Sequence, residues 1–340
     1  MPIHSPDRQH HAAPPQVLPV REQARVVNSL LKLRFERLLP EVMRETDFDM
    51  WVLLCNEDNP DPVFNTAIPF DTWTPILQVV VFARNADGAV DRLNLSRTNM
   101  RGLYENVWDP NGKDDQWACL KRVVKERNPK RIGVNESEVM WAADGLTAAL
   151  RRRLEEALGT RYASRLQSAE PLCIRWLETL IDEELTVYER AVSLGHYLIR
   201  DTFSSHAITP GVTTCEDLRY HYWQRAVDLG LRPSFLPFFN LVRSDSMKKE
   251  YDQADGVIRQ GDLIHCDTGV EYLRLITDHQ ENAYVLRTGE ADAPEGLRAA
   301  LREANRLQDV FAAEFQQGLT GNQILKNALT KARAAGIPNP

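Results

Sequence analysis

The sequence has little of what marks several large classes of protein. It contains only five cysteines in 340 residues, with no CxxC pair, and an odd number of scattered thiols argues against a disulfide framework or a zinc knuckle. No apolar run approaches the ~18 residues that a membrane-spanning helix needs. A Gly-rich phosphate loop and internal repeats are also missing. We therefore expect reduced, mostly buried thiols at Cys55, Cys119, Cys173, Cys215 and Cys266.

The chain also has no large excess of positive or negative charge. The net charge of −7 is spread along the chain, which argues against nucleic acid or an anionic membrane as a partner. The N-terminus has neither a basic nor an apolar segment of a secretory signal, so we expect a cytoplasmic protein. Residues 1–20, rich in Pro and His, are expected to form a disordered tail.

What is present is the composition of a globular α/β protein, with 43% hydrophobic and 26% charged residues. The length predicts two domains, which we place at residues 21–180 and 181–340. In the first, apolar runs and helical periodicity alternate, which is typical of an α/β layer with a mixed sheet. The predicted helices cover 22–44, 117–127 and 144–158, and the predicted strands cover 50–55, 76–84, 89–95 and 131–135.

The second domain is expected to begin with a long helix from Asp182. Thr213 and Glu216 have the spacing of a capping box before the next helix. An aromatic segment with Phe235, Phe238 and Phe239 follows, and its side chains fit either a substrate pocket or the core. Strands are predicted at 263–267, 270–275 and 282–287, and helices at 295–316 and 322–334.

Two aspartates in this domain carry the candidate chemistry. Asp267 ends an apolar strand, and Asp278 follows the next predicted strand eleven positions later. A strand, a turn and a returning strand can bring both carboxylates together, where a divalent cation would relieve their repulsion. Taken alone, the pattern favours ordinary turn residues, because aspartate is common in turns.

A resemblance to a known family favours the metal site instead. The segment 260–278, with its apolar strand before Asp267 and a second aspartate at Asp278, resembles the metal-binding strand pair of the creatinase/aminopeptidase-P (M24) metallopeptidases. The likeness extends from about residue 21 to the end of the chain. It includes Ile132-Gly-Val-Asn135, Asp144-Gly-Leu146, Ser168-Ala-Glu170, Trp176-Leu-Glu178, Pro210-Gly211-Val-Thr and Gln260-Gly261-Asp262-Leu.

The resemblance implies a creatinase-type N-terminal domain followed by a pita-bread domain, and a homodimer. It also implies a dinuclear site for Mn, Co or Zn, with Asp267 and Asp278 as two of five ligands, and hydrolysis of Xaa-Pro peptide bonds. The chain departs from the family in two ways: it stops before the last three ligands, a His and two Glu, and residues 240–258 contain no histidine. We therefore expect this chain to be weakly active or inactive, and no catalytic residue is assigned.

His265 lies two residues before Asp267, so strand alternation places both side chains on one face. It fits either a second-sphere partner of the metal site or a hydrogen-bonded core histidine. Two other functions stay open for the chain. One is a non-catalytic pita-bread scaffold that binds peptides or partners, and the other is creatinase-like C–N hydrolysis on the same fold.

Overall fold

The computed structural model describes residues 15–251 and 255–338, and they form two compact units. Of the tail expected over residues 1–20, residues 1–14 lie outside the described part. Unit 1 runs to Tyr197 and also takes in Asp228–Ser234 and Val270–Thr277. Unit 2 consists of Leu198–Val227, Phe235–Gly269 and the chain from Asp278 onward.

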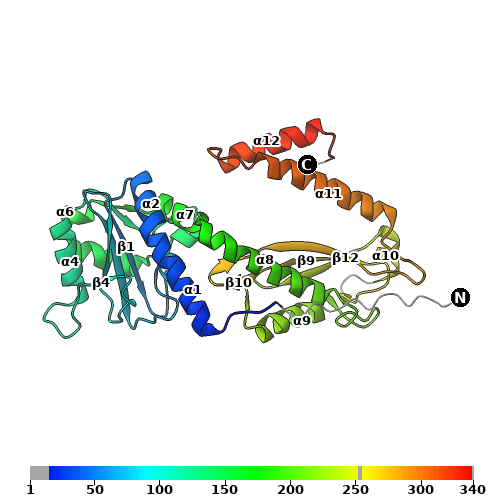
Figure 1. Ribbon diagram of the computed structural model, residues 1–340, viewed down its shortest axis with the longest axis horizontal. Helices are drawn as coiled ribbons and strands as arrows, with labels where there is room; N and C mark the ends of the chain where they lie inside the picture. Colours follow the sequence, from blue (N-terminus) through cyan, green and yellow to red (C-terminus); the bar gives the residue numbers. More distant parts are fainter. Residues whose placement is uncertain (1–14, 252–254, 339–340) are drawn as a thin grey trace. The chain divides into compact units, whose positions relative to one another are not determined.

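Unit 1 is built on a six-stranded sheet with the order β4-β3-β2-β1-β5-β6 (Figure 1). Strand β1 pairs antiparallel with β2 and parallel with β5, so the mixed sheet predicted from the sequence is confirmed. The strands are β1 Met50–Asn56, β2 Leu77–Arg84, β3 Val90–Asn94, β4 Glu105–Asn106, β5 Ile132–Val134 and β6 Leu166–Ser168.

Helices cover both faces of this sheet, which explains the unbroken apolar run in β1. Because side chains alternate along a strand, Trp51 and Leu53 join one core and Val52 and Leu54 the other. The first core is covered by α1 Val20–Leu33, α2 Leu39–Glu45, α3 Pro62–Ala67 and α7 Glu170–Glu178. The second is covered by α4 Gln116–Arg127, α5 Ala148–Leu158 and α6 Thr160–Ala163.

Two helix predictions in unit 1 need correction. The expected helix 22–44 is interrupted by a π-helical turn, η1 Arg34–Leu38, between α1 and α2. The expected helix 144–158 begins only at Ala148, because the Thr147 hydroxyl accepts a hydrogen bond from the Leu150 N–H and caps it. Residues Trp141–Ala143 before it form a short 3₁₀ turn, η2.

A small second sheet in unit 1 has the order β11-β10-β7. Its strands are β7 Arg232–Pro233, β10 Val270–Tyr272 and β11 Leu275–Ile276. The single strand predicted over 270–275 is wrong, because the chain turns back at Leu273 and Arg274, with φ of 55° and 65°. A left-handed turn made by two residues with side chains is rare. The sequence has no glycine or asparagine at these two positions, the residues from which such a turn is usually predicted.

Unit 2 contains a three-stranded sheet with the order β12-β9-β8. Its strands are β8 Phe238–Val242, β9 Leu263–Thr268 and β12 His279–Tyr284. Helix α8 Asp182–Thr202 runs from unit 1 into unit 2, where α9 Cys215–Asp228 and α10 Asp245–Glu250 follow. The last two helices, α11 Glu295–Glu314 and α12 Gly321–Ala334, pack on each other, and the buried Glu314 carboxylate pairs with Lys331.

The predicted capping box before α9 is shifted by one residue. Thr214 and Asp217 form it: the Thr214 hydroxyl accepts from the Asp217 N–H at 3.1 Å, and the Asp217 carboxylate accepts from the Thr214 N–H at 2.8 Å. Thr213 instead accepts from the Thr209 N–H and donates to the Ala207 carbonyl. Its hydroxyl therefore stabilises the preceding turn rather than the helix.

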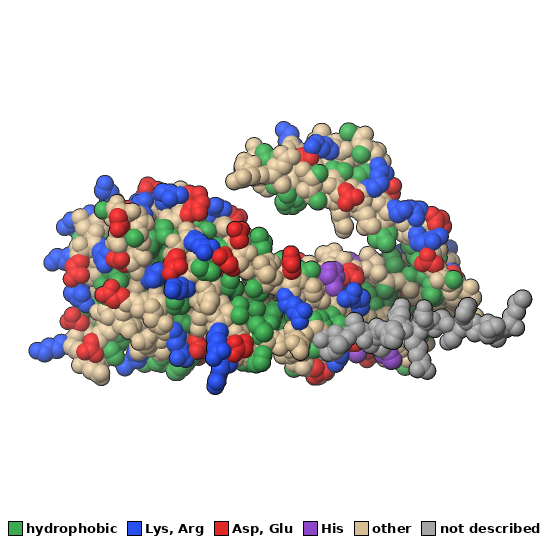
Figure 2. Space-filling view, in the orientation of Figure 1, with side chains coloured by type: hydrophobic (Ala, Val, Ile, Leu, Met, Phe, Trp, Pro, Cys, Tyr) green, Lys and Arg blue, Asp and Glu red, His purple; other side chains and the backbone are tan. Residues whose placement is uncertain are grey.

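The cysteines, the helices and the surface charge are in the arrangement described next. All five cysteines are free thiols, and all but Cys215 are buried, as expected. Within residues 15–251 and 255–338, no helix is long and apolar enough to cross a membrane. Figure 2 shows acidic and basic side chains intermingled over the visible face of unit 1, so no large field of one sign forms there.

Candidate functional site

The candidate site lies on one face of the sheet β12-β9-β8. In the antiparallel register, Asp267 lies opposite Phe238 of β8 and Gln280 of β12. His265 lies opposite Asn240 and Asn282. Because directly opposed residues point to the same side, this face carries one carboxylate, one imidazole, three amides and one aromatic ring.

The other face of the sheet is apolar and packed. Ile264 and Cys266 alternate with the site residues and are fully buried. Phe239 is also buried there, with its ring 6.3 Å from that of Tyr222 of α9 and 6.1 Å from that of Phe203. Of the aromatic cluster predicted from the sequence, Phe239 is therefore a core residue. Phe238 points to the site face and is 51% exposed.

A buried ion pair holds the start of β9 against the end of β8. The Arg243 guanidinium donates to both carboxylate oxygens of Asp262, at 2.8 and 2.9 Å, and neither side chain is exposed. The Arg259 N–H also donates to Asp262. Gly261, at φ 93°, makes the preceding turn, and a Cβ there would lie 2.6 Å from the Arg287 guanidinium. These contacts position β9, the strand that carries Asp267.

A closed hairpin returns the chain from Asp267 to Asp278. The Thr277 N–H donates to the Val270 carbonyl at 2.9 Å, and the Val270 N–H donates to the Thr277 hydroxyl at 3.1 Å. Asp278 follows directly and precedes β12, in which His279 lies opposite Thr268. Two residues before Gln280, Asp278 therefore lies on the side of the sheet that carries Asp267.

The strand predicted over 282–287 is thus wrong in its bounds, since β12 covers His279–Tyr284. The polar sequence His279-Gln-Glu-Asn282 has no apolar alternation, which is why the periodicity missed it. The pairing with β9, not side-chain propensity, makes it a strand. Gln280 and Asn282, which come to the site face through this strand, were missed for the same reason.

The two carboxylates influence each other electrostatically. Burial, followed by the negative charge of Asp278 and a hydrogen bond with it, raises the pKa of Asp267, and nearby His265 opposes the shift. In addition, Asp267 Oδ1 is buried without a hydrogen-bond partner among the described residues. A buried carboxylate oxygen without a donor is costly, so this pair is suited to a cation that binds both groups.

The two carboxylates have no third metal-binding side chain grouped with them in the described part of the chain. In the described ranges 15–251 and 255–338, no group of three or more His, Cys, Asp or Glu side chains is arranged to hold a metal ion. His265 is close enough to lower the pKa of Asp267, and its Nδ1 lies 3.2 Å from Asn282 Oδ1. That contact links the imidazole to Asn282 of the neighbouring strand β12.

Comparisons with known proteins place this geometry in a known fold. No protein-family model and no curated protein sequence matches the chain. Solved structures do. An X-Pro aminopeptidase from Thermotoga maritima is 15% identical with a TM-score of 0.62, over 87% of this chain and 78% of that one.

Two further solved structures are similar over nearly the whole chain. An Xaa-Pro dipeptidase from Bacillus anthracis is 16% identical with a TM-score of 0.58, over 94% of this chain and 78% of that one. A prolidase from Pyrococcus horikoshii is 11% identical with a TM-score of 0.56, over 93% and 78%. At such identities the likeness concerns the fold, and the fold of this chain is the one seen in solved X-Pro aminopeptidases and prolidases, as the sequence motifs predicted.

Proposed function

We propose that this chain carries the aspartate half of a divalent-metal site in a hydrolase that acts on Xaa-Pro peptide bonds. The observation that supports the proposal most is the pairing of Asp267 with Asp278 on one face of a sheet in this fold. The raised pKa of Asp267 and its unpartnered Oδ1 give the pair a physical reason to bind a cation.

The residues of the face have distinct roles in this proposal. Asp267 and Asp278 hold Mn, Co or Zn as ionised ligands, and His265 keeps the electrostatic potential at Asp267 less negative. Bound divalent ions supply a water-derived nucleophile at neutral pH. Phe238, exposed directly opposite Asp267, offers an apolar surface to a substrate side chain or proline ring.

The proposal is tested by calorimetric titration of Mn²⁺ into the 340-residue chain. Because two carboxylates without a third grouped donor make a weak site, we expect a dissociation constant on the order of 10⁻⁴ M or weaker. Asp267→Ala and Asp278→Ala should each abolish the binding. Asp309→Ala, at an exposed position of α11, is the matched control and should leave it unchanged.

The outcomes separate the parts of the proposal. Mn²⁺ binding that survives both aspartate substitutions would show that the pair is not the site. Tight binding of two ions, lost in both variants, would support the peptidase and contradict the expected weakness, because further ligands would then complete the site. Turnover of an Xaa-Pro peptide at a rate normal for such enzymes would contradict the expected low activity.

A second candidate is a non-catalytic scaffold that binds peptides. The lack of a third metal-binding side chain beside the pair, within the described residues, favours it. Titration of an Xaa-Pro peptide with and without EDTA distinguishes the two. Equal affinity in both conditions indicates the scaffold, whereas affinity that requires Mn²⁺ indicates the hydrolase.

A further inference from the structure

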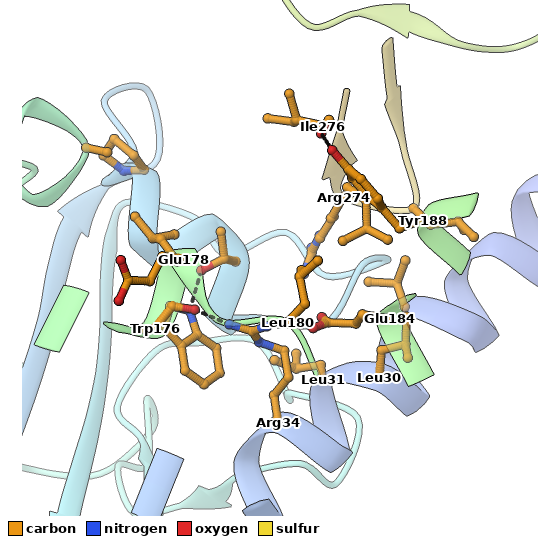
Figure 3. A pocket seen from close by; sticks show the side chains of 17 residues that line it. Leu30, Leu31, Arg34, Trp176, Glu178, Leu180, Glu184, Tyr188, Arg274 and Ile276 are labelled. Carbon is orange, nitrogen blue, oxygen red and sulfur yellow. Dashed lines mark hydrogen bonds and ion pairs between the residues drawn. The ribbon is translucent and has the colours of Figure 1, made fainter. Parts of the chain in front are cut away.

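A cavity of about 540 Å³ lies within unit 1, and neither residue of the aspartate pair lines it, although the hairpin that connects the two aspartates forms part of its wall. Its walls come from α1, from α7 and the segment after it, from the start of α8, and from the hairpin β10–β11 (Figure 3). Much of the wall is aliphatic, with Leu30, Leu31, Leu177, Leu180 and Leu275 among the lining residues. The volume is in the usual range of small-molecule sites.

Two irregular pieces of backbone each place an arginine at this cavity. The π-helical turn η1 begins at Arg34, and π-turns within helices are rare and frequent at functional sites. Arg274 is the second residue of the left-handed turn, beside Leu273. Such a conformation costs on the order of 1 kcal/mol or more for a residue with a Cβ. The π-helical turn and the left-handed turn, both uncommon backbone conformations, thus each contribute an arginine to the same cavity.

The charge of Arg34 is already balanced. Its Nη1 lies 2.8 Å from a carboxylate oxygen of Glu184 and donates to the Thr179 carbonyl at 2.9 Å. Its guanidinium also donates to the Trp176 carbonyl and lies 4.3 Å from the centre of the Trp176 ring. Figure 3 shows Arg34 and Glu184 facing each other across this part of the wall. Arg34 therefore shapes the cavity but offers no spare charge.

The charge of Arg274 is not balanced in this way. Its Nη1 donates to the Ile68 carbonyl at 2.6 Å, and no carboxylate forms an ion pair with it anywhere in the described ranges. Glu271 attracts it from a distance but is itself paired with Arg232. Burial lowers the pKa of Arg274 to about 10, which reflects the cost of holding this cation out of water.

The remaining acid at the cavity is also engaged elsewhere. Glu178 lines the wall, but Arg175 donates to it at 3.1 Å. The cavity therefore combines apolar walls with one cation that lacks an anionic partner. A carboxylate would give Arg274 the charge-assisted, bidentate contact that arginine favours.

We propose that this cavity binds a small amphipathic anion, with its carboxylate on Arg274 and its apolar body on the leucine side chains of α1 and α7. The inference is independent of the proposed hydrolase function, since it uses no residue of the aspartate pair. A single-chain fatty carboxylate of medium length has the required chemistry.

Octanoate is the probe that tests the proposal, with octanol and octylammonium as neutral and cationic counterparts of equal length. Binding to the 340-residue chain is measured by calorimetry. We expect octanoate to bind at least about tenfold more tightly than octanol, because it adds a charge-assisted hydrogen bond. Octylammonium should bind more weakly than octanol. Equal binding of all three would overturn the proposal.

Two pairs of variants locate the site. Ile276→Glu places a negative charge at an exposed position on the cavity wall and should weaken octanoate binding about tenfold, whereas Ile276→Gln should not. Arg274→Met should remove the preference for octanoate over octanol. Arg152→Met, on the exposed side of α5, should preserve it.

Each result decides the matter. Octanoate affinity unchanged by Ile276→Glu would show that binding occurs elsewhere, and equal loss in the Glu and Gln variants would show that charge is not the reason. If Arg274→Met does not melt cooperatively, the two Ile276 variants, which keep Arg274 and its hydrogen bond, give the answer alone.

Discussion

The six-stranded sheet of unit 1 and the sheet β12-β9-β8 of unit 2 differ in how many of their faces are buried. Strand β1 of unit 1 is covered on both sides, so Val52 and Leu53 are both buried although they point in opposite directions. Strand β9 of unit 2 is packed on one side only. Its other side carries Asp267 and His265, beside Phe238 and Val242 of β8, which are 51% and 50% exposed. The first sheet supplies stability, and the second leaves polar groups accessible for chemistry.

Among the substitutions that test this comparison, the largest loss of stability is expected at the buried ion pair between Arg243 and Asp262 in the sheet of unit 2. Asp262→Ala leaves the Arg243 guanidinium buried without its carboxylate, which should lower the free energy of unfolding by about 3–5 kcal/mol. Glu303→Ala removes an exposed partner of Arg306 at 2.7 Å and should change it by less than about 1 kcal/mol. Urea denaturation measures both. A loss below about 1 kcal/mol for Asp262→Ala would mean that the sheet does not depend on this pair.

The same substitution in both sheets tests the comparison directly. Val52→Ala removes about two methylene equivalents from a site that is 1% exposed and should cost about 1.5–3 kcal/mol. Val242→Ala, at a site that is 50% exposed, should cost less than about 1 kcal/mol. Denaturant midpoints of the two variants give the difference. Equal losses would show that the site face of β8 is covered in solution.

The smallest effect concerns the carboxylate pair and depends on pH. Because the pKa of Asp267 is raised in the folded state, folding favours the protonated form. The stability that this provides is present below the ordinary aspartate pKa and is lost as the pH rises through the folded-state value. Without metal, Asp267→Asn should therefore be slightly more stable than the wild type near pH 7, with the advantage shrinking toward acid pH.

Thermal melts in EDTA between about pH 4 and pH 8 measure this difference, which should stay below about 1 kcal/mol for a group with this much solvent contact. Addition of Mn²⁺ should stabilise the wild type and not the variant, since bound cations offset the repulsion between the carboxylates. A variant that is less stable than the wild type at every pH would contradict the repulsion on which the metal-site hypothesis depends.

Much of this architecture can be predicted from the sequence wherever one local signal dominates. The apolar run of β1 predicts a strand covered on both faces, and simple alternation places His265 and Asp267 together. The turn at Leu273 and Arg274 has no such signal, because tertiary contacts such as that of Arg274 with the Ile68 carbonyl fix it. The ion pair between Arg243 and Asp262 also could not be predicted from the sequence, because the positions of the two residues do not indicate that the end of β8 lies beside the start of β9.

The closed hairpin between the two aspartates has a further consequence for how this region can vary in length. Val270 and Thr277 are bonded to each other at its base, so the chain leaves β9 and enters β12 at fixed points whatever lies between them. The register of Asp278 against Asp267 is then set at the base and not by the number of residues in the excursion. Related chains could lengthen or shorten the tip and keep the carboxylates in place, so the spacing of eleven residues is a property of this hairpin's tip, whereas the pairing of the two acids is a property of its base.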